Sequence, residues 1–217
     1  MVPDGLTTAA QDYVNAALAD LQSHGVAVSL SSDDANGMGG GGKLGGYFDE
    51  DGPTFFVASA STPELWLSVF VHEYQHFRQW LAKSPTWTAK IGTDCCAWYV
   101  FDAWLQGVVE LTPQQRDDAI RIILACELEC ETMSLAEIHS HPLLGITADW
   151  YCRAANVYLA WYGVIRLTRR WYDASPYSDS SLVSLMPGER LLTIEEAMQP
   201  SPAVVAAVMA KVYTEVL

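Results

Sequence analysis

Residues 71–77 read Val-His-Glu-Tyr-Gln-His-Phe, and this stretch combines a helical pattern with a chemical one. In an α-helix, residues four positions apart lie on the same face, one turn from each other. His72 and His76 can therefore bind one metal ion together. Glu73 lies next to them on the helix and can accept a proton from a water molecule at that ion. The spacing predicts half of a catalytic metal site.

The residues on both sides of this motif are mostly apolar. Residues 65–71 read Leu-Trp-Leu-Ser-Val-Phe-Val, and residues 77–81 read Phe-Arg-Gln-Trp-Leu. This pattern predicts a helix that is buried on most of its faces and forms a rigid platform for a metal ion. A chance match on an ordinary core helix is the alternative. Two histidines and a glutamate are costly to bury unless they bind something, which favours the metal site.

Length and composition predict one folded domain that does not bind nucleic acid. The chain has 217 residues, of which 50% are hydrophobic, so it can bury a sizeable core. Its formal net charge is −14, because 26 acidic residues outnumber 12 Lys and Arg. This balance argues against binding to a phosphate backbone and suits either simple solubility or a basic partner.

The lack of a visible targeting signal and the odd number of cysteines predict a cytoplasmic protein without a membrane segment. The first residues lack the basic segment followed by an apolar segment that is typical of a secretory signal peptide. The longest apolar run, residues 154–165, has 12 residues and is too short to span a bilayer. Five cysteines, an odd number, indicate reduced thiols. Two of them, Cys126 and Cys130, are four residues apart and can share a metal, but small buried side chains are the simpler interpretation.

The order of predicted elements indicates an α+β fold with a small antiparallel or mixed sheet packed on a mainly helical domain. The expected elements are a helix at 7–23, a strand at 26–30, a Gly-rich loop at 31–46, a hairpin of 46–48 with 54–58, a helix from Pro63 to 81 or 82, a helix from Asp94 to 108, a capping-box helix at 112–139, a helix at 147–171 and a last helix at 201–216. We expect one domain over residues 1–217: residues 1–43 hold the first helix, strand and loop, 44–140 the core with the motif, and 141–217 a helical part.

A catalytic zinc ion needs a third protein ligand and one open position. On a helical projection, the face centred on Glu127 also holds Glu131 and six mostly apolar residues, namely Ile120, Ile123, Leu124, Cys130, Ser134 and Ile138. Carboxylates on an apolar face need a cation or hydrogen-bond donors. Glu129 points to the opposite side. The alternative is a helix in another register with solvated acids. Other candidate ligands are Cys95, Cys96, Asp102, Glu110, Glu137, His139 and His141.

The two motifs together resemble those of gluzincins, zinc metallopeptidases in which H-E-x-x-H is joined by a Glu from a later helix. Residues 127–131 read Glu-Leu-Glu-Cys-Glu and fit the second motif, Glu-x-x-small-acidic. The resemblance covers residues 44–138 and implies that Glu127 is the third zinc ligand and that Glu131 orients a zinc-bound histidine. The distance from His76 to Glu127 is longer than in compact families, which leaves the choice between Glu127 and Glu131 open.

The compact plan also resembles ImmA/IrrE-like and phage-encoded metallopeptidases, which implies a place in the cytoplasm of a host cell or in a virion. In those proteins a strand such as Thr54–Ser59 precedes the active helix, and its edge can hold a substrate peptide as an added strand. The implied activity is hydrolysis of a peptide or protein substrate, with Zn²⁺ as cofactor and Glu73 as general base. Candidates for stabilising the oxyanion are His139, His141, Tyr158, Tyr162 and Arg166.

Two other functions fit the sequence less well. The first is a non-catalytic structural or interaction protein on the same scaffold, with a structural metal held by four protein ligands. The intact Glu73 argues against it, because a structural site needs no base. The second is an acidic decoy for a basic partner. Its acidic residues are scattered among apolar helices instead of forming one face, which argues against that function.

Overall fold

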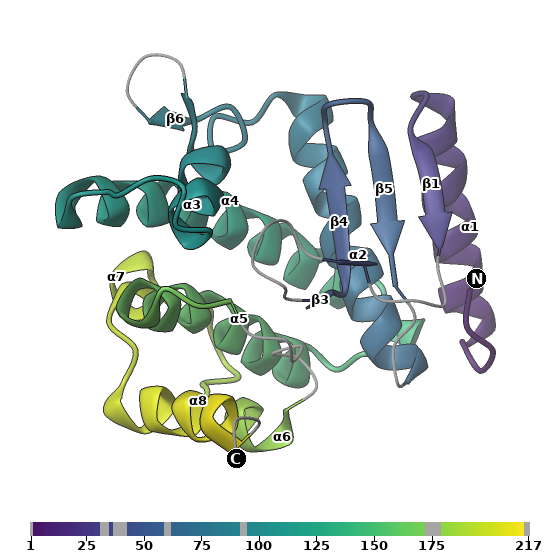
Figure 1. Ribbon diagram of the computed structural model, residues 1–217. Helices are drawn as coiled ribbons and strands as arrows, with labels where there is room; N and C mark the ends of the chain where they lie inside the picture. The colour runs from purple at the N-terminus through teal and green to yellow at the C-terminus, as the bar shows by residue number, and fades with distance from the viewer. Residues whose placement is uncertain are drawn as a thin grey trace.

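The computed structural model describes residues 2–30, 35–36, 43–58, 62–91, 95–171 and 179–214 (Figure 1). The helices are α1 (Thr8–Ser23), α2 (Pro63–Ala82), α3 (Ala97–Leu105), α4 (Pro113–Ser140), α5 (Ala148–Thr168), α6 (Ser180–Val183), α7 (Ile194–Met198) and α8 (Pro202–Thr214), with a 3-10 turn, η1, at Pro142–Leu144. The strands are β1 (Ala27–Leu30), β2 (Ala35–Asn36), β3 (Lys43–Leu44), β4 (Gly46–Asp49), β5 (Thr54–Val57), β6 (Lys90–Ile91) and β7 (Cys95–Cys96). The predicted α+β class, mostly helical with a small mixed sheet, is confirmed.

The main sheet has three strands in the order β1-β5-β4. The central strand, β5, is parallel to β1 and antiparallel to β4. Its residues Phe55, Phe56 and Val57 are all buried, as expected for a strand covered on both faces. β4 is the edge nearer the helical part, and β1 is the far edge (Figure 1).

This strand order makes one prediction wrong. The strand Thr54–Ser59 was expected to offer its edge to a substrate peptide. Its described part, β5, has a neighbouring strand on each side, so neither of its edges is free. Ser59 lies outside the described residues. The edge that faces the helices belongs to β4, because the parallel strand β1 takes the other side of β5.

Helix α2 begins and ends where the sequence predicts. Thr62 caps it by accepting a hydrogen bond from the backbone N–H of Leu65, with Pro63 at the first helical position. The helix ends at Lys83, whose φ of 52° is left-handed. Thirteen of its 20 residues are buried, because α2 packs against β4, β5, α1 and α4. The motif therefore lies on a helix held on several sides, as expected for a rigid platform.

Helix α4 confirms the predicted capping box and the predicted buried face. Thr112 and Gln115 exchange hydrogen bonds between side chain and backbone at its start. All eight residues of the face centred on Glu127 are buried. Glu127 is 2% exposed and Glu131 is 0% exposed, so the alternative register with solvated acids is wrong.

Two apolar clusters form the core, and α4 passes through both. One cluster joins α1, the sheet, α2 and the start of α5, with Phe55, Trp66 and Phe70 fully buried. The other joins α3, the first half of α4, α5 and the short C-terminal helices. In Figure 1, α4 crosses the centre of the molecule between α2 and α5, consistent with its packing against both.

Several predicted boundaries differ from the observed ones. The helix expected at 94–108 is α3, which begins at Ala97 after the short strand β7 and ends at Leu105. Gly107 follows with a φ of 74°, which only a glycine adopts easily. Asp94, its expected cap, lies outside the described residues. The helix expected at 147–171 ends at Thr168, while the expected end of the last helix, residue 216, lies outside the described residues. The short elements α6, α7 and η1 and the strand pairs β2–β3 and β6–β7 were not predicted.

The expected Gly-rich loop is described only in part. Residues 31–34 and 37–42 lie outside the described residues, while β2 and β3 pair as a short antiparallel ribbon. The cysteines Cys96, Cys126, Cys130 and Cys152 are free thiols, in agreement with the prediction for these four. None of the helices in the described ranges combines the length and the hydrophobicity that a membrane crossing requires.

Candidate metal centre

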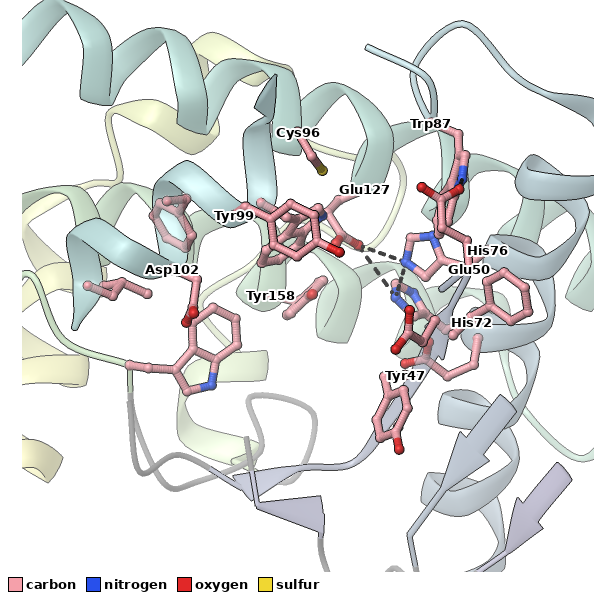
Figure 2. Close-up of a pocket in the computed structure, with 18 residues that line it drawn as sticks. Tyr47, Glu50, His72, His76, Trp87, Cys96, Tyr99, Asp102, Glu127 and Tyr158 are labelled. Atoms are coloured by element: carbon pink, nitrogen blue, oxygen red, sulfur yellow. Dashed lines mark hydrogen bonds and ion pairs between the residues drawn. The ribbon is translucent and has the colours of Figure 1, made fainter. Parts of the chain in front are cut away.

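The structure brings two histidines of α2 and one glutamate of α4 to a single point. The Nε2 atoms of His72 and His76 lie 3.1 Å apart. The Oε2 atom of Glu127 lies 3.5 Å from the first and 3.3 Å from the second. Figure 2 shows the three side chains converging, with dashed lines between them. All three are buried, with exposed fractions of 4%, 8% and 2%.

The hydrogen bonds around His76 fix which of its ring nitrogens carries the proton. The amide nitrogen of Gln79 donates to two acceptors, the backbone carbonyl of Cys126 and the carboxylate of Glu129. The amide oxygen of Gln79 therefore faces Nδ1 of His76, at 2.8 Å. An oxygen there requires a proton on Nδ1. In the neutral ring, Nε2 of His76 then carries a free lone pair.

The same argument applies to His72. Its Nδ1 atom lies 3.2 Å from Oε1 of Glu131, a carboxylate that only accepts. Glu131 is itself held in place by the hydroxyl of Tyr151, which donates to its other oxygen at 2.7 Å. In neutral His72, Nδ1 is thus the donor, and Nε2 carries a free lone pair. Glu131 takes the position in which it was expected to orient a metal-bound histidine.

When both imidazoles are neutral, as metal-bound histidines are, three acceptor atoms face one another with no donor between them. Oε2 of Glu127 is fully buried and accepts no hydrogen bond from any described residue. A buried, unpartnered carboxylate oxygen is costly unless a cation compensates it. Burial lowers the pKa of His72 and His76, but Cys130 and the nearby carboxylates raise it well above the usual value, so that without a metal ion the two rings take up protons in its place. The arrangement attracts positive charge.

The spacing of the three atoms fits a small divalent ion. A point equidistant from them lies about 1.9 Å from each, slightly inside the zinc–nitrogen and zinc–oxygen distances of about 2.0–2.2 Å. A zinc ion held by these three residues would need only small shifts of their side chains. Two imidazoles and one carboxylate are also a donor set that zinc prefers in catalytic sites. The residues present fit zinc.

Cys130 is the other buried group that can take part in a metal site. Together with His72 and His76 it forms a buried group whose possible ligand atoms all lie within 4.8 Å of one another. Its Sγ atom, however, approaches His72 on the Nδ1 side, at 3.6 Å, and donates to the backbone carbonyl of His72 at 3.2 Å. The two Nε2 atoms and Glu127 converge on the opposite side of that ring. We therefore favour Glu127 over Cys130 as the third ligand.

Gln79 and the role of Glu129 were not predicted from the sequence. Besides Gln79, the carboxylate of Glu129 accepts hydrogen bonds from Ser84, at 2.6 Å, and from Thr86. Burial raises the pKa of Glu129, but these three donors lower it below the usual value. Glu129 thus holds Gln79, which holds His76. The position of Gln79, three residues after His76 on the same helix face, was the available signal.

Glu73 lies beside the three converging atoms and packs against the backbone of β4. A Cβ atom at Gly46 would lie 2.7 Å from Cγ and 3.0 Å from Oε1 of Glu73. Because that Cβ would also lie 2.8 Å from Cγ1 of Val69, no side chain fits at position 46 unless Glu73 and Val69 both move. Glu73 is 6% exposed, and its burial raises its pKa, although the two histidines act in the opposite direction. A raised pKa suits a group that must both accept and return a proton.

The centre lies at one end of a cavity of about 210 Å³. Its walls come from β4 and the following turn, α2, α3, α4 and α5, and they include His72, Glu73, His76 and Glu127. Among the candidates for oxyanion stabilisation, Tyr158 lines the cavity, and Figure 2 shows it near Glu127. Its hydroxyl lies 2.9 Å from that of Tyr162.

The remaining candidate residues lie elsewhere or have other partners. His139 and His141 are exposed near the end of α4, where each contacts a backbone carbonyl one turn earlier. Arg166 forms an ion pair with Asp117. Among the other candidate ligands, Cys96 and Asp102 line the cavity, Glu110 pairs with Arg169, Glu137 pairs with Arg78, and the side chain of Cys95 lies outside the described residues.

The likeness to gluzincins rests on the spacing and the geometry of these side chains. Comparison of the chain with models of protein families, with curated proteins and with solved structures finds no match.

Proposed function

We propose that this chain is a zinc-dependent peptidase with a zincin-like, gluzincin-type site. One observation carries the proposal. Three buried acceptor atoms, on His72, His76 and Glu127, converge within 3.5 Å of one another beside an open cavity, and the carboxylate oxygen among them has no hydrogen-bond donor in the described chain. Glu73 lies next to them on the same cavity wall, where a base is needed.

Each residue has a role that follows from its position. His72, His76 and Glu127 hold the zinc, and Glu131 and Gln79 orient the two imidazoles through their Nδ1 protons. Bound zinc polarises a carbonyl group and lowers the pKa of a water molecule to about 7. Glu73 accepts the proton of the attacking water and returns it to the leaving amine.

Two further features of the cavity suit a peptide. Tyr158 lines the cavity, and its hydroxyl is our candidate to donate to the carbonyl oxygen as negative charge develops on it. The whole of β4, from Gly46 to Asp49, also lines the cavity, and it is an edge of the main sheet. We therefore assign to β4, not β5, the backbone pairing with an extended substrate.

A structural metal site is the second candidate. The observation in its favour is the buried group of His72, His76 and Cys130, because a fourth protein ligand would close the site. It requires the thiol to leave the backbone carbonyl of His72 and reach the Nε2 side of the ring. The replacement of Cys130 by serine, described in the Discussion, separates the two candidates.

Removal and return of the metal tests the proposal directly. We expect the purified chain to hold one zinc per molecule and to cleave members of a broad peptide library. A chelator should abolish cleavage, and added zinc should restore it, whereas added Mg²⁺ should not, because magnesium prefers oxygen ligands. Metal content is measured by elemental analysis and cleavage by mass spectrometry. A chain that holds zinc and cleaves no peptide contradicts the peptidase proposal.

The close approach of Gly46 to Glu73 gives a sharp prediction about activity. Gly46→Ala should keep zinc and lower kcat roughly 10²-fold, because a displacement of the base by about 1 Å has effects of that size. Gly45→Ala is the matched control, since a Cβ there would meet Val69 at 3.5 Å, an ordinary contact. Metal content and kcat are measured for both variants. Equal kcat values for the two would show that position 46 does not set the place of Glu73.

A further inference from the structure

The cavity contains more negative charge than the metal centre requires. Five carboxylates line it, and no Lys or Arg is among its lining residues in the described chain. Glu73 and Glu127 belong to the centre. Asp49 accepts a hydrogen bond from the backbone of Asp51, and Glu50 accepts one from the indole of Trp87 at 2.7 Å. The fifth, Asp102, is left to explain.

Asp102 lies on α3 at the end of the cavity away from the metal centre. Figure 2 shows it well separated from His72 and His76, with Tyr158 between them. Within the described ranges its carboxylate accepts a hydrogen bond from Gln106, the exposed residue that caps the end of α3, and forms no ion pair. The cavity therefore has at its far end a carboxylate that no cation of the described residues neutralises.

Apolar and aromatic side chains accompany this carboxylate. Trp98 and Leu105 lie four residues before and three after Asp102, so they share its helix face, and both line the cavity. Trp171 also lines the cavity and contacts Tyr162, with ring centroids 5.9 Å apart. Trp98 is 36% exposed, so part of its ring is open to a ligand.

These surroundings match one kind of side chain. Lysine and arginine have a long apolar stem and a terminal cation, so the stem packs on aromatic and aliphatic surfaces while the cation meets a carboxylate. An acidic side chain would meet like charge here, and a short apolar one would leave the carboxylate without a partner. The net charge of −14 acts in the same direction by attracting cationic peptides.

We propose that the Asp102 end of the cavity is a specificity pocket for a lysine or arginine side chain of the substrate, so that the proposed peptidase acts on basic peptides. This inference rests on the proposed function, because a specificity pocket presupposes a substrate. Its test measures binding and does not require cleavage. Binding can be measured with the Glu73→Gln variant loaded with zinc, because that variant keeps the cavity and Asp102. Trp87, Trp98 and Trp171 line the cavity and report binding through their fluorescence.

The experiment uses alanine heptapeptide amides with one lysine at each position in turn, and the same series with norleucine or glutamate. Norleucine keeps the stem of lysine and lacks the cation. At one position we expect lysine to bind at least 10-fold more tightly than norleucine and glutamate to bind most weakly. The preference should shrink in 0.5 M NaCl, since salt screens charges near the surface.

Two variants and one control assign the preference to Asp102. Asp102→Asn should make lysine and norleucine peptides bind equally, and Asp102→Lys should reverse the order so that glutamate binds best. Asp12→Asn removes the same charge from the exposed face of α1 and should leave the preference intact. Equal binding of the three series by the parent protein overturns the pocket, as does a lysine preference that survives Asp102→Asn.

The outcomes also separate this inference from the proposed function. If the wild-type chain cleaves peptides without regard to lysine or arginine, the pocket is wrong and the peptidase stands. If lysine peptides bind through Asp102 and none is cleaved by the zinc-loaded wild type, the pocket stands and the peptidase is wrong.

Discussion

Glu73→Gln should hold one zinc like the wild type and lose peptide turnover by at least ~10²-fold, the lower end of what a positioned acid–base group contributes. Glutamine keeps the size of the side chain and its contact with Gly46 but has no basicity. The loss should fall on kcat, because the change removes proton transfer and leaves the substrate-binding surface unchanged. The measurement is steady-state kinetics on a peptide that the wild type cleaves, with metal content determined on the same samples.

The control for this change lies on the same helix. Glu64 is exposed in the first turn of α2, so Glu64→Gln makes the same chemical change away from the cavity and should leave both zinc and kcat unaltered. If Glu73→Gln and the wild type turn over peptides at the same rate, Glu73 is not the base. If both are equally inert while both hold zinc, a structural metal becomes the better explanation.

Glu127→Ala should nearly abolish zinc binding, and this is the second large effect. The change removes one of three ligands and leaves two imidazole lone pairs 3.1 Å apart without the carboxylate that shares their ion. Glu131→Gln should weaken zinc binding by roughly 10–100-fold, the usual effect of losing a group that orients a ligand. Dissociation constants are measured by competition with a chromophoric chelator. The opposite ranking would exchange the roles of Glu127 and Glu131.

Cys130→Ser completes this series, because it separates a catalytic from a structural metal. In the catalytic arrangement the thiol contacts His72 from the Nδ1 side and the backbone, so its loss should change zinc affinity little. If Cys130→Ser loses zinc as fully as Glu127→Ala does, the thiol is a fourth ligand and the site is closed. Thermal unfolding with and without zinc gives an independent measure, because a bound metal stabilises the folded chain by linkage.

The parts of the site that repeat along one helix could be predicted from the sequence. His72 and His76 share a face because residues four apart always do, and that face is buried because its neighbours are apolar. Glu127 and Glu131 were placed on the buried face of α4 by the same periodicity. The structure adds that Glu127 meets the Nε2 atoms and Glu131 the Nδ1 side of His72.

The features that depend on contacts between elements could not be predicted in this way. The position of β5 between β1 and β4 is decided by which strands pair, and nothing in the pattern of residues 54–58 separates a central strand from an edge strand that is buried on one face. Gly46 reads as part of a Gly-rich loop, and its contact with Glu73 exists only once β4 packs on α2. The role of Gln79 likewise depends on Glu129, which comes from another helix.

The candidate metal centre lies between the two apolar clusters, and this position has a mechanical consequence. His72 and His76 lie on a helix that packs in the cluster of the sheet, whereas Glu127 lies on α4 between residues that pack in or against the helical cluster. A bound ion would therefore cross-link the two apolar clusters of the core. Catalytic competence and cohesion of the molecule would then depend on the same ion, so that chain newly made without metal would stay both inactive and loosely joined.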